Sequence, residues 1–142
     1  RAKYISEHLT SPSRVIQGDS QKLSEYDVPK FDLCLTSAPY MRSFDKENPL
    51  TNYHEEGDYE IYMKGMRKIF EQVKDLMKPN AYVLVEVENT FEKGVPMTPL
   101  AWDLAKKLSE IFFLERELVY CHDGDLKTSK VNHSYVLIFK KK

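Results

Sequence analysis

The sequence predicts an α/β domain with a mainly parallel sheet, and two patterns support this fold class. Apolar runs of strand length alternate with segments whose apolar residues recur at helical spacing, an order typical of parallel sheets with helices on both faces. The last two apolar runs, residues 113–120 and 134–139, are joined by a Gly-Asp loop without a helix, which favours an antiparallel pair at one edge. A chain of 142 residues, 42% of them hydrophobic, is long enough to form one domain, residues 1–142.

The first half of the chain is predicted to contain a short helix at residues 1–9, a strand at 14–17, a short helix at 20–25 and a strand at 31–36. The run 31–36 is apolar almost throughout, which is typical of a strand covered on both faces. Asp58 is the expected N-cap of a long amphipathic helix that ends near Met77. Residues 41–57 are polar and lack periodicity, so we expect a loop that is mobile or is ordered by a partner.

The second half begins with the strongest strand pattern, residues 82–87, which we expect to run parallel to 14–17 and 31–36 in one sheet. Thr98 and Pro99 are the expected N-cap and first residue of the next helix. Apolar residues at helical spacing indicate the buried stripe of that helix: Leu100, Leu104, Leu108 and Ile111.

Composition gives weaker guidance about partners. The net charge of −1 and pI of about 6.5 do not show the basic excess of most nucleic-acid binders, although a local basic patch can lie on a neutral protein. Cys34 and Cys121 fall in apolar runs and are expected to be buried, without a disulfide. His54 and its acidic neighbours favour a solvated loop over a metal site. No apolar run reaches the length of a membrane span, so we expect a cytoplasmic protein without a membrane partner.

Two polar turns follow predicted strands: Gly18-Asp19-Ser20 and Ser37-Ala38-Pro39-Tyr40. Ligands of open α/β sheets bind beyond the carboxyl ends of the strands, so we expect both turns to flank one cleft. In the second turn, the Ser37 hydroxyl and the Ala38 carbonyl offer two acceptors for the hydrogens of an aromatic amine. Such binding would direct the nitrogen lone pair at an electrophilic methyl group. The Tyr40 ring could stack on a base that has been flipped out of a duplex.

The turn Thr36-Ser37-Ala38-Pro39-Tyr40 resembles the T-S-P-P-Y motif of amino-group DNA methyltransferases, and residues 15–20 resemble the strand and acidic turn that precede it. The Lys78-Pro79-Asn80 turn and the closing strand are also similar to that family. The resemblance implies a Rossmann-like class I methyltransferase sheet, S-adenosylmethionine as cofactor and a role in DNA modification such as restriction-modification. It assigns Asp19 and Ser20 to cofactor binding, and it assigns the catalytic role to Ser37, Ala38, Pro39 and Tyr40.

Two features depart from the family pattern. Ala38 replaces the first proline of the motif, and no Gly-x-Gly turn is present to hold the methionine part of the cofactor. We therefore expect an incomplete sheet, with the cofactor-side strands supplied by an upstream or downstream segment or by a second chain. The serine in the motif leans the prediction toward cytosine in DNA.

Several alternatives stay open at this point. The chain can be a non-catalytic remnant or fragment, or it can belong to an RNA base methyltransferase. A dehydrogenase-like nucleotide binder is disfavoured because the sequence has no G-x-G-x-x-G turn. Asp19 can be merely a helix cap, and Glu86 and Glu88 either line the pocket or are simply exposed at a strand end.

Overall fold

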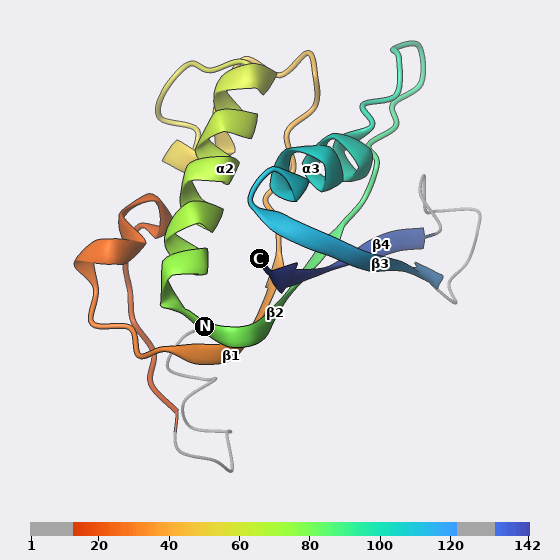
Figure 1. Ribbon diagram of the computed structural model, residues 1–142. Helices are drawn as coiled ribbons and strands as arrows, with labels where there is room; N and C mark the ends of the chain where they lie inside the picture. The colour runs from red at the N-terminus through yellow and green to blue at the C-terminus, as the bar shows by residue number, and fades with distance from the viewer. Residues whose placement is uncertain (1–12, 122–132) are drawn as a thin grey trace.

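The computed structural model describes residues 13–121 and 133–142, which form a four-stranded sheet covered by two α-helices (Figure 1). The predicted helix at residues 1–9 lies outside the described residues. The elements follow in the order η1 (Ser20–Glu25), β1 (Phe31–Ser37), η2 (Pro49–Thr51), α2 (Tyr59–Leu76), β2 (Met77–Val87), α3 (Leu100–Ser109), β3 (Phe112–Cys121) and β4 (His133–Lys141).

The strand order in the sheet is β1-β2-β4-β3. β1 and β2 are parallel, with Leu33 opposite Tyr82 and Ser37 opposite Glu86. β4 lies between β2 and β3 and is antiparallel to both. The structure thus confirms the parallel pairing of the second and third predicted strands and the antiparallel pair formed by the last two, with β3 at the edge.

The prediction of a strand at residues 14–17 was wrong. These residues are exposed and have no regular structure, and the chain turns into η1 at Ser20. An apolar run becomes a strand only when a neighbour completes its backbone hydrogen bonds, and none of the described strands pairs with this segment. The described sheet is therefore mixed, with β1·β2 as its one parallel pair.

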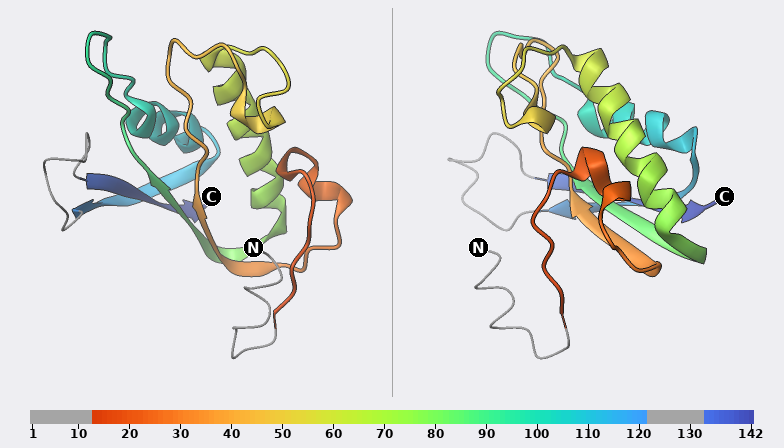
Figure 2. Two further views of the ribbon diagram at one scale, coloured as in Figure 1. Left: turned by 180° about the vertical axis from the view of Figure 1, so that it is seen from behind. Right: turned by 90° about the vertical axis from the view of Figure 1, so that its left-hand side faces the viewer.

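The two α-helices lie on the same face of the sheet, as the right-hand view of Figure 2 shows. Alternate residues of β2 and β4 point toward them and are fully buried, notably Val83, Val85 and Phe139. On the opposite face, Leu33 and Leu35 of β1 are 55% and 70% exposed. We expected helices on both faces, but within the described residues they cover only one.

The caps of the two helices differ from each other. The Asp58 side chain caps α2, as predicted, by accepting a hydrogen bond from the Ile61 amide at 2.7 Å. Thr98 does not cap α3, whose N-cap is Pro99; instead, Asn89 Oδ1 accepts from the Ala101 amide. The Thr98 hydroxyl accepts a hydrogen bond from the Ser43 amide at 2.9 Å, so it ties the segment after β2 to the segment after β1.

Residues 41–57 form a loop with hydrogen bonds of its own. An antiparallel bridge joins Glu47 to Glu56, and η2 lies between them. Asn48 is buried, and its backbone carbonyl accepts from the amides of Thr51 and Tyr53. Met41 at the start of the loop is fully buried. These contacts lie within the chain, because polar residues without periodicity can still satisfy one another's backbone groups. The expected mobility of this segment stays a prediction.

The two cysteines differ in burial. Cys34 is half-buried against α2, and this burial raises the pKa of its thiol; Cys121 is exposed, contrary to our prediction. Cys121 lies on the edge strand β3, where the apolar sequence pattern is not matched by a covering element. In the described parts of the chain no helix is long and apolar enough to cross a membrane. The same parts contain no cluster of three or more side chains suited to a metal ion.

Candidate active site

The turn after β1 is held in place from two sides. The Ala38 amide donates to the Glu86 carbonyl at 3.3 Å, which extends the β1·β2 ladder by one residue. The hydroxyl of Tyr62, a buried residue of α2, donates to the Pro39 carbonyl at 2.7 Å. Burial raises the pKa of Tyr62, with the neighbouring Tyr40 adding to the shift, so the hydroxyl stays protonated as a donor. From the sequence we assign Tyr62 to core packing rather than to a base-stacking surface, because an aromatic residue at helical spacing indicates core packing; its hydrogen bond to the turn was not predicted.

Ser37 is oriented by a carboxylate of the neighbouring strand. Its hydroxyl donates to Glu86 Oε2 at 2.6 Å, a contact that follows from the pairing of these two residues in the β1·β2 register. The single hydroxyl hydrogen is directed at Glu86, and the Tyr40 hydroxyl lies within hydrogen-bond reach of Ser37 Oγ. A hydroxyl oxygen has two lone pairs, so Ser37 Oγ can still accept from a ligand. Glu86 is thus part of the site rather than a merely exposed strand-end residue.

Tyr40 presents its ring at the end of the turn, with 38% of the residue exposed. Partial burial raises the pKa of its hydroxyl, and the nearby carboxylates of Glu86 and Glu88 raise it further. Tyr40 is therefore a neutral, flat side chain, which suits stacking against an aromatic ligand.

Asp19 caps η1 and also lines a cleft. Its Oδ1 accepts from the Gln21 amide at 2.9 Å, and its own amide donates to the Tyr26 hydroxyl at 2.8 Å. The Tyr26 ring lies so close to Gly18 that a Cβ there would be 2.4 Å from it, so a larger residue would displace the end of the Tyr26 side chain. Asp19 is therefore a helix cap, the alternative to a binding role that the sequence left open. The cap also fixes the position of its carboxylate at the cleft.

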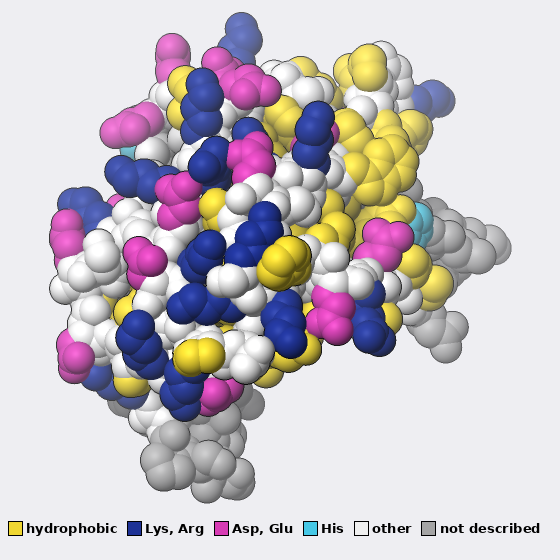
Figure 3. Space-filling view, viewed as in Figure 1, with side chains coloured by type: hydrophobic (Ala, Val, Ile, Leu, Met, Phe, Trp, Pro, Cys, Tyr) yellow, Lys and Arg dark blue, Asp and Glu magenta, His cyan; other side chains and the backbone are white. Residues whose placement is uncertain are grey.

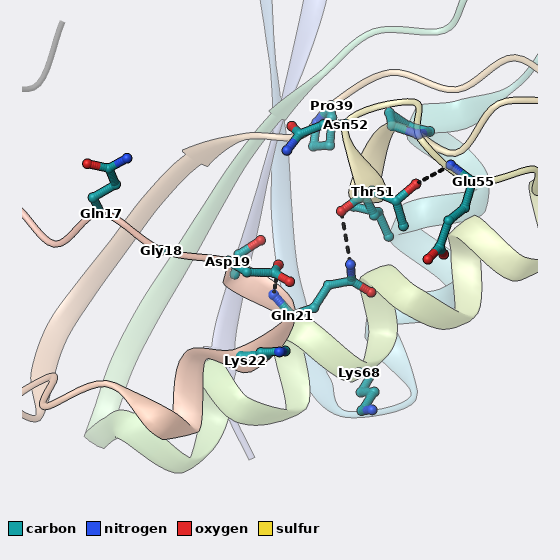
Figure 4. A pocket seen from close by; sticks show the side chains of 13 residues that line it. Gln17, Gly18, Asp19, Gln21, Lys22, Pro39, Thr51, Asn52, Glu55 and Lys68 are labelled. Carbon is teal, nitrogen blue, oxygen red and sulfur yellow. Dashed lines mark hydrogen bonds between the residues drawn. The ribbon is translucent and has the colours of Figure 1, made fainter.

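A cleft of about 760 Å³ brings three of the predicted site residues together: Asp19, Ser20 and Pro39. Asp19 reaches it from the turn before η1, Pro39 from the turn after β1, and Lys68 from α2 (Figure 4). Gln21 joins η1 to η2 across the cleft by donating to the Leu50 carbonyl at 2.9 Å. Ser37 and Tyr40 are not among the residues that line this cleft; Tyr40 lines a neighbouring cavity. We expected the turns 18–20 and 37–40 to flank one cleft. Of the second turn, only Pro39 lines the cleft that contains Asp19 and Ser20.

Figure 3 shows Lys and Arg side chains over α2, with Asp and Glu side chains among them. The helix carries four basic residues, Lys64, Arg67, Lys68 and Lys74, and three acidic ones, Glu60, Glu71 and Asp75. Part of this charge is internally balanced, since Arg67 pairs with Glu71 at 3.0 Å and also with Glu110. Lys68 belongs to the wall of the cleft itself.

No protein-family model matches the sequence, and no curated protein matches it. Solved structures match over most of the chain. One of them is TTHA0409 of Thermus thermophilus, which is described as a DNA modification methylase on a provisional basis. It matches with a TM-score of 0.65 and 19% sequence identity, and the match covers 87% of this chain and 52% of TTHA0409. The PvuII DNA methyltransferase, which is specific for cytosine N4, has a TM-score of 0.62 and 18% identity over 88% of this chain and 48% of its own.

The chain has a methyltransferase fold. This conclusion rests on the match of both structures over 87–88% of the chain at TM-scores of 0.65 and 0.62, and it confirms the predicted Rossmann-like class. TrmN from Thermus thermophilus matches as well, with a TM-score of 0.56 and 15% identity over 89% of this chain and 28% of its own. The chain spans about half the length of TTHA0409 and of the PvuII enzyme.

Proposed function

We propose that this chain is the base-binding part of an S-adenosylmethionine-dependent methyltransferase that modifies an exocyclic amino group of a nucleic-acid base, with cytosine in DNA as the first candidate. One observation carries the proposal: Asp19 and Ser20 share a cleft with Pro39, at the end of β1, in a chain whose fold matches that of methyltransferases. Lys68 of α2, in the wall of the cleft, suits a polyanionic substrate.

The cleft is compatible with the adenosyl part of the cofactor. It is large and polar, and the carboxylate of Asp19 and the hydroxyl of Ser20 can accept hydrogen bonds from amino and hydroxyl groups of an adenosine. One structure of TTHA0409 contains S-adenosylmethionine. When bound, S-adenosylmethionine supplies an electrophilic methyl group. The sequence has no Gly-x-Gly turn, so the proposal assigns the methionine part to a segment outside these 142 residues or to a second chain.

The turn after β1 supplies what the amine requires. The lone pair of an aromatic amine is delocalised into the ring, so the nitrogen becomes a nucleophile only when its two hydrogens are held out of the ring plane. Ser37 Oγ is one acceptor, since its own hydrogen is bonded to Glu86. The Pro39 carbonyl is engaged by Tyr62, which makes the Ala38 carbonyl the second acceptor. Tyr40 stacks on the base and fixes its plane.

Transfer of a labelled methyl group tests the proposal. The longest natural polypeptide that contains this chain is incubated with labelled S-adenosylmethionine and, in parallel, with DNA and with RNA. We expect incorporation into DNA and a loss of about 10²-fold in rate for Ser37→Ala, the size of effect seen when one hydrogen bond that orients a reacting group is removed. Ser13→Ala, at an exposed position away from the turn, is the matched control.

A non-catalytic remnant is the second candidate, and the lack of a Gly-x-Gly turn is the observation that favours it. Cofactor binding without transfer to DNA or RNA would support the remnant. Transfer to RNA alone would support the RNA base methyltransferase that the motif also allows. Full activity of Ser37→Ala would refute the assignment of the site.

A further inference from the structure

A second cavity, of about 400 Å³, lies next to the candidate active site and shares Tyr40 with it. The loop of residues 41–57 supplies the rest of its wall, including two more aromatic residues, Phe44 and Tyr53. Both rings are open to solvent, since Phe44 is 41% and Tyr53 59% exposed. Three aromatic side chains, one from the turn after β1 and two from the loop, are partly exposed around one hollow and do not belong to the core.

Arg42 forms a flat, fixed wall of this cavity. Its guanidinium carbon lies 4.6 Å from the centre of the Phe44 ring. The guanidinium plane is locked by Asp45, which accepts from Arg42 Nε at 2.9 Å, and by Glu92 from the segment after β2. Desolvation raises the pKa of the Asp45 carboxyl, whereas the hydrogen bonds and the charge of Arg42 lower it. The lowering prevails, so Asp45 stays ionised beside Arg42. A guanidinium held in this way acts as a stacking surface rather than as a free cation.

Tyr53 is presented by a strained backbone. Asn52 and Tyr53 adopt φ angles of +52° and +62°, the left-handed region that disfavours side chains as large as tyrosine. The conformation is fixed from below by buried Asn48, whose carbonyl accepts from the Tyr53 amide at 3.1 Å. Strain of this kind is concentrated at ligand sites, where the surrounding structure maintains it for function.

The charges around the cavity discriminate between ligands. Arg42 and Lys46 are balanced by Asp45 and Glu47, so the lining has no net charge to hold a phosphate by itself. Aromatic faces hold a flat, uncharged ring, and carboxylate oxygens accept hydrogen bonds from ring amino groups. This chemistry matches a nucleobase better than it matches the sugar-phosphate backbone.

We propose that Phe44, Tyr53 and Arg42 form a stacking site for an unpaired nucleobase next to the target base on the same strand. Tyr40 separates the two bases, because it belongs both to the catalytic turn and to the wall of this cavity. The site makes the enzyme sensitive to the base that flanks its target. The inference rests on the proposed function only in that the ligand is a nucleic acid; it does not require methyl transfer.

The test measures stacking directly. The chain is titrated with a single-stranded DNA oligonucleotide that carries the fluorescent base 2-aminopurine beside a cytosine, because stacking on an aromatic side chain quenches this fluorophore. We expect quenching on binding and about tenfold weaker binding for Tyr53→Ala and for Phe44→Ala, within the range known for one lost base stack. Tyr53→Phe keeps the ring and should bind like the wild type. The matched control is Phe113→Ala, which removes a ring that is 60% exposed at the opposite end of the sheet.

A stability measurement separates binding from folding. Tyr53→Gly relieves the left-handed strain and removes the ring, so it should melt at a higher temperature than Tyr53→Ala while binding equally weakly. Unchanged quenching in both Tyr53→Ala and Phe44→Ala would overturn the proposal, as would equal competition by inorganic pyrophosphate, which would reveal an ionic site. If quenching follows the prediction but no methyl transfer occurs in any assay, the proposed function fails and this site stands. If the Tyr53→Ala enzyme transfers methyl groups and its binding is unchanged, the proposed function stands and this stacking site fails.

Discussion

The two faces of the sheet differ sharply in how they are covered. On one face, the side chains of Val83, Val85 and Phe139 are fully buried under α2 and α3. On the other face, Leu33 and Leu35 are more than half exposed although their strand is as apolar as β2. The covered face therefore stabilises the described fold, whereas the apolar residues of the open face contribute little to its stability.

The largest expected effect is on the covered face. Phe139→Ala removes a ring that lies 6.0 Å from that of Phe112, and it should lower the free energy of unfolding by about 3–5 kcal/mol. Leu35→Ala, on the open face, should change the free energy of unfolding by no more than about 0.5 kcal/mol. Urea denaturation of both variants measures the difference. Equal losses would mean that the open face is covered in the protein in solution, and the contrast between the faces would collapse.

The second prediction concerns Tyr40, the aromatic residue of the turn after β1. Tyr40→Ala should raise the KM for the nucleic acid by an amount equivalent to about 1–3 kcal/mol, the contribution of one stacked base. Tyr40→Phe keeps the ring and should retain most of the affinity. Steady-state kinetics of methyl transfer with both variants provide the measurement. If Tyr40→Phe fails as badly as Tyr40→Ala, the hydroxyl rather than the stacking face is what the site uses.

A smaller effect on stability and activity is expected from Tyr62, the residue of α2 that contacts the turn after β1. Tyr62→Phe removes the hydroxyl that donates to the Pro39 carbonyl, which should cost about 1 kcal/mol of stability. The freed carbonyl then competes with that of Ala38 for the amine, so kcat should fall while KM changes little. Thermal melting and kinetics on the same preparation separate the two effects. A variant with a normal kcat would show that α2 does not position the turn.

The sequence predicted the elements of the covered face better than those of the cleft. Asp58 as N-cap, the long helix and the β2 pattern followed from local rules that the tertiary structure did not override. Residues 14–17 carry the same apolar signal but have no described strand to pair with, so the pattern misled. The turn 37–40 was found from its residues, whereas its contacts with Tyr62 and Glu86 depend on register and helix rotation, which no local pattern encodes.

The smallest expected effect is that of Ala38→Pro, which restores the first proline of the motif. The substitution stiffens the turn on the open edge of β1, but it removes the amide that donates to the Glu86 carbonyl at 3.3 Å. The two effects oppose each other, so activity should change by less than about threefold, since a hydrogen bond contributes about 1 kcal/mol. Initial rates at saturating cofactor measure the change. A tenfold loss would show that the amide contact, not the rigidity, maintains the catalytic geometry.

The position of the transferred methyl group tests the central claim most directly. DNA that has been treated with S-adenosylmethionine and the longest natural polypeptide containing this chain is digested to nucleosides, and the methylated nucleoside is identified by mass spectrometry and chromatography. The proposed function predicts N4-methylcytosine, because it assigns Ser37 Oγ and the Ala38 carbonyl as the acceptors of the amine. Ser37→Ala should form this product about 10²-fold more slowly. Methylation of a ring carbon, or N4-methylcytosine formed at an undiminished rate by Ser37→Ala, would contradict it.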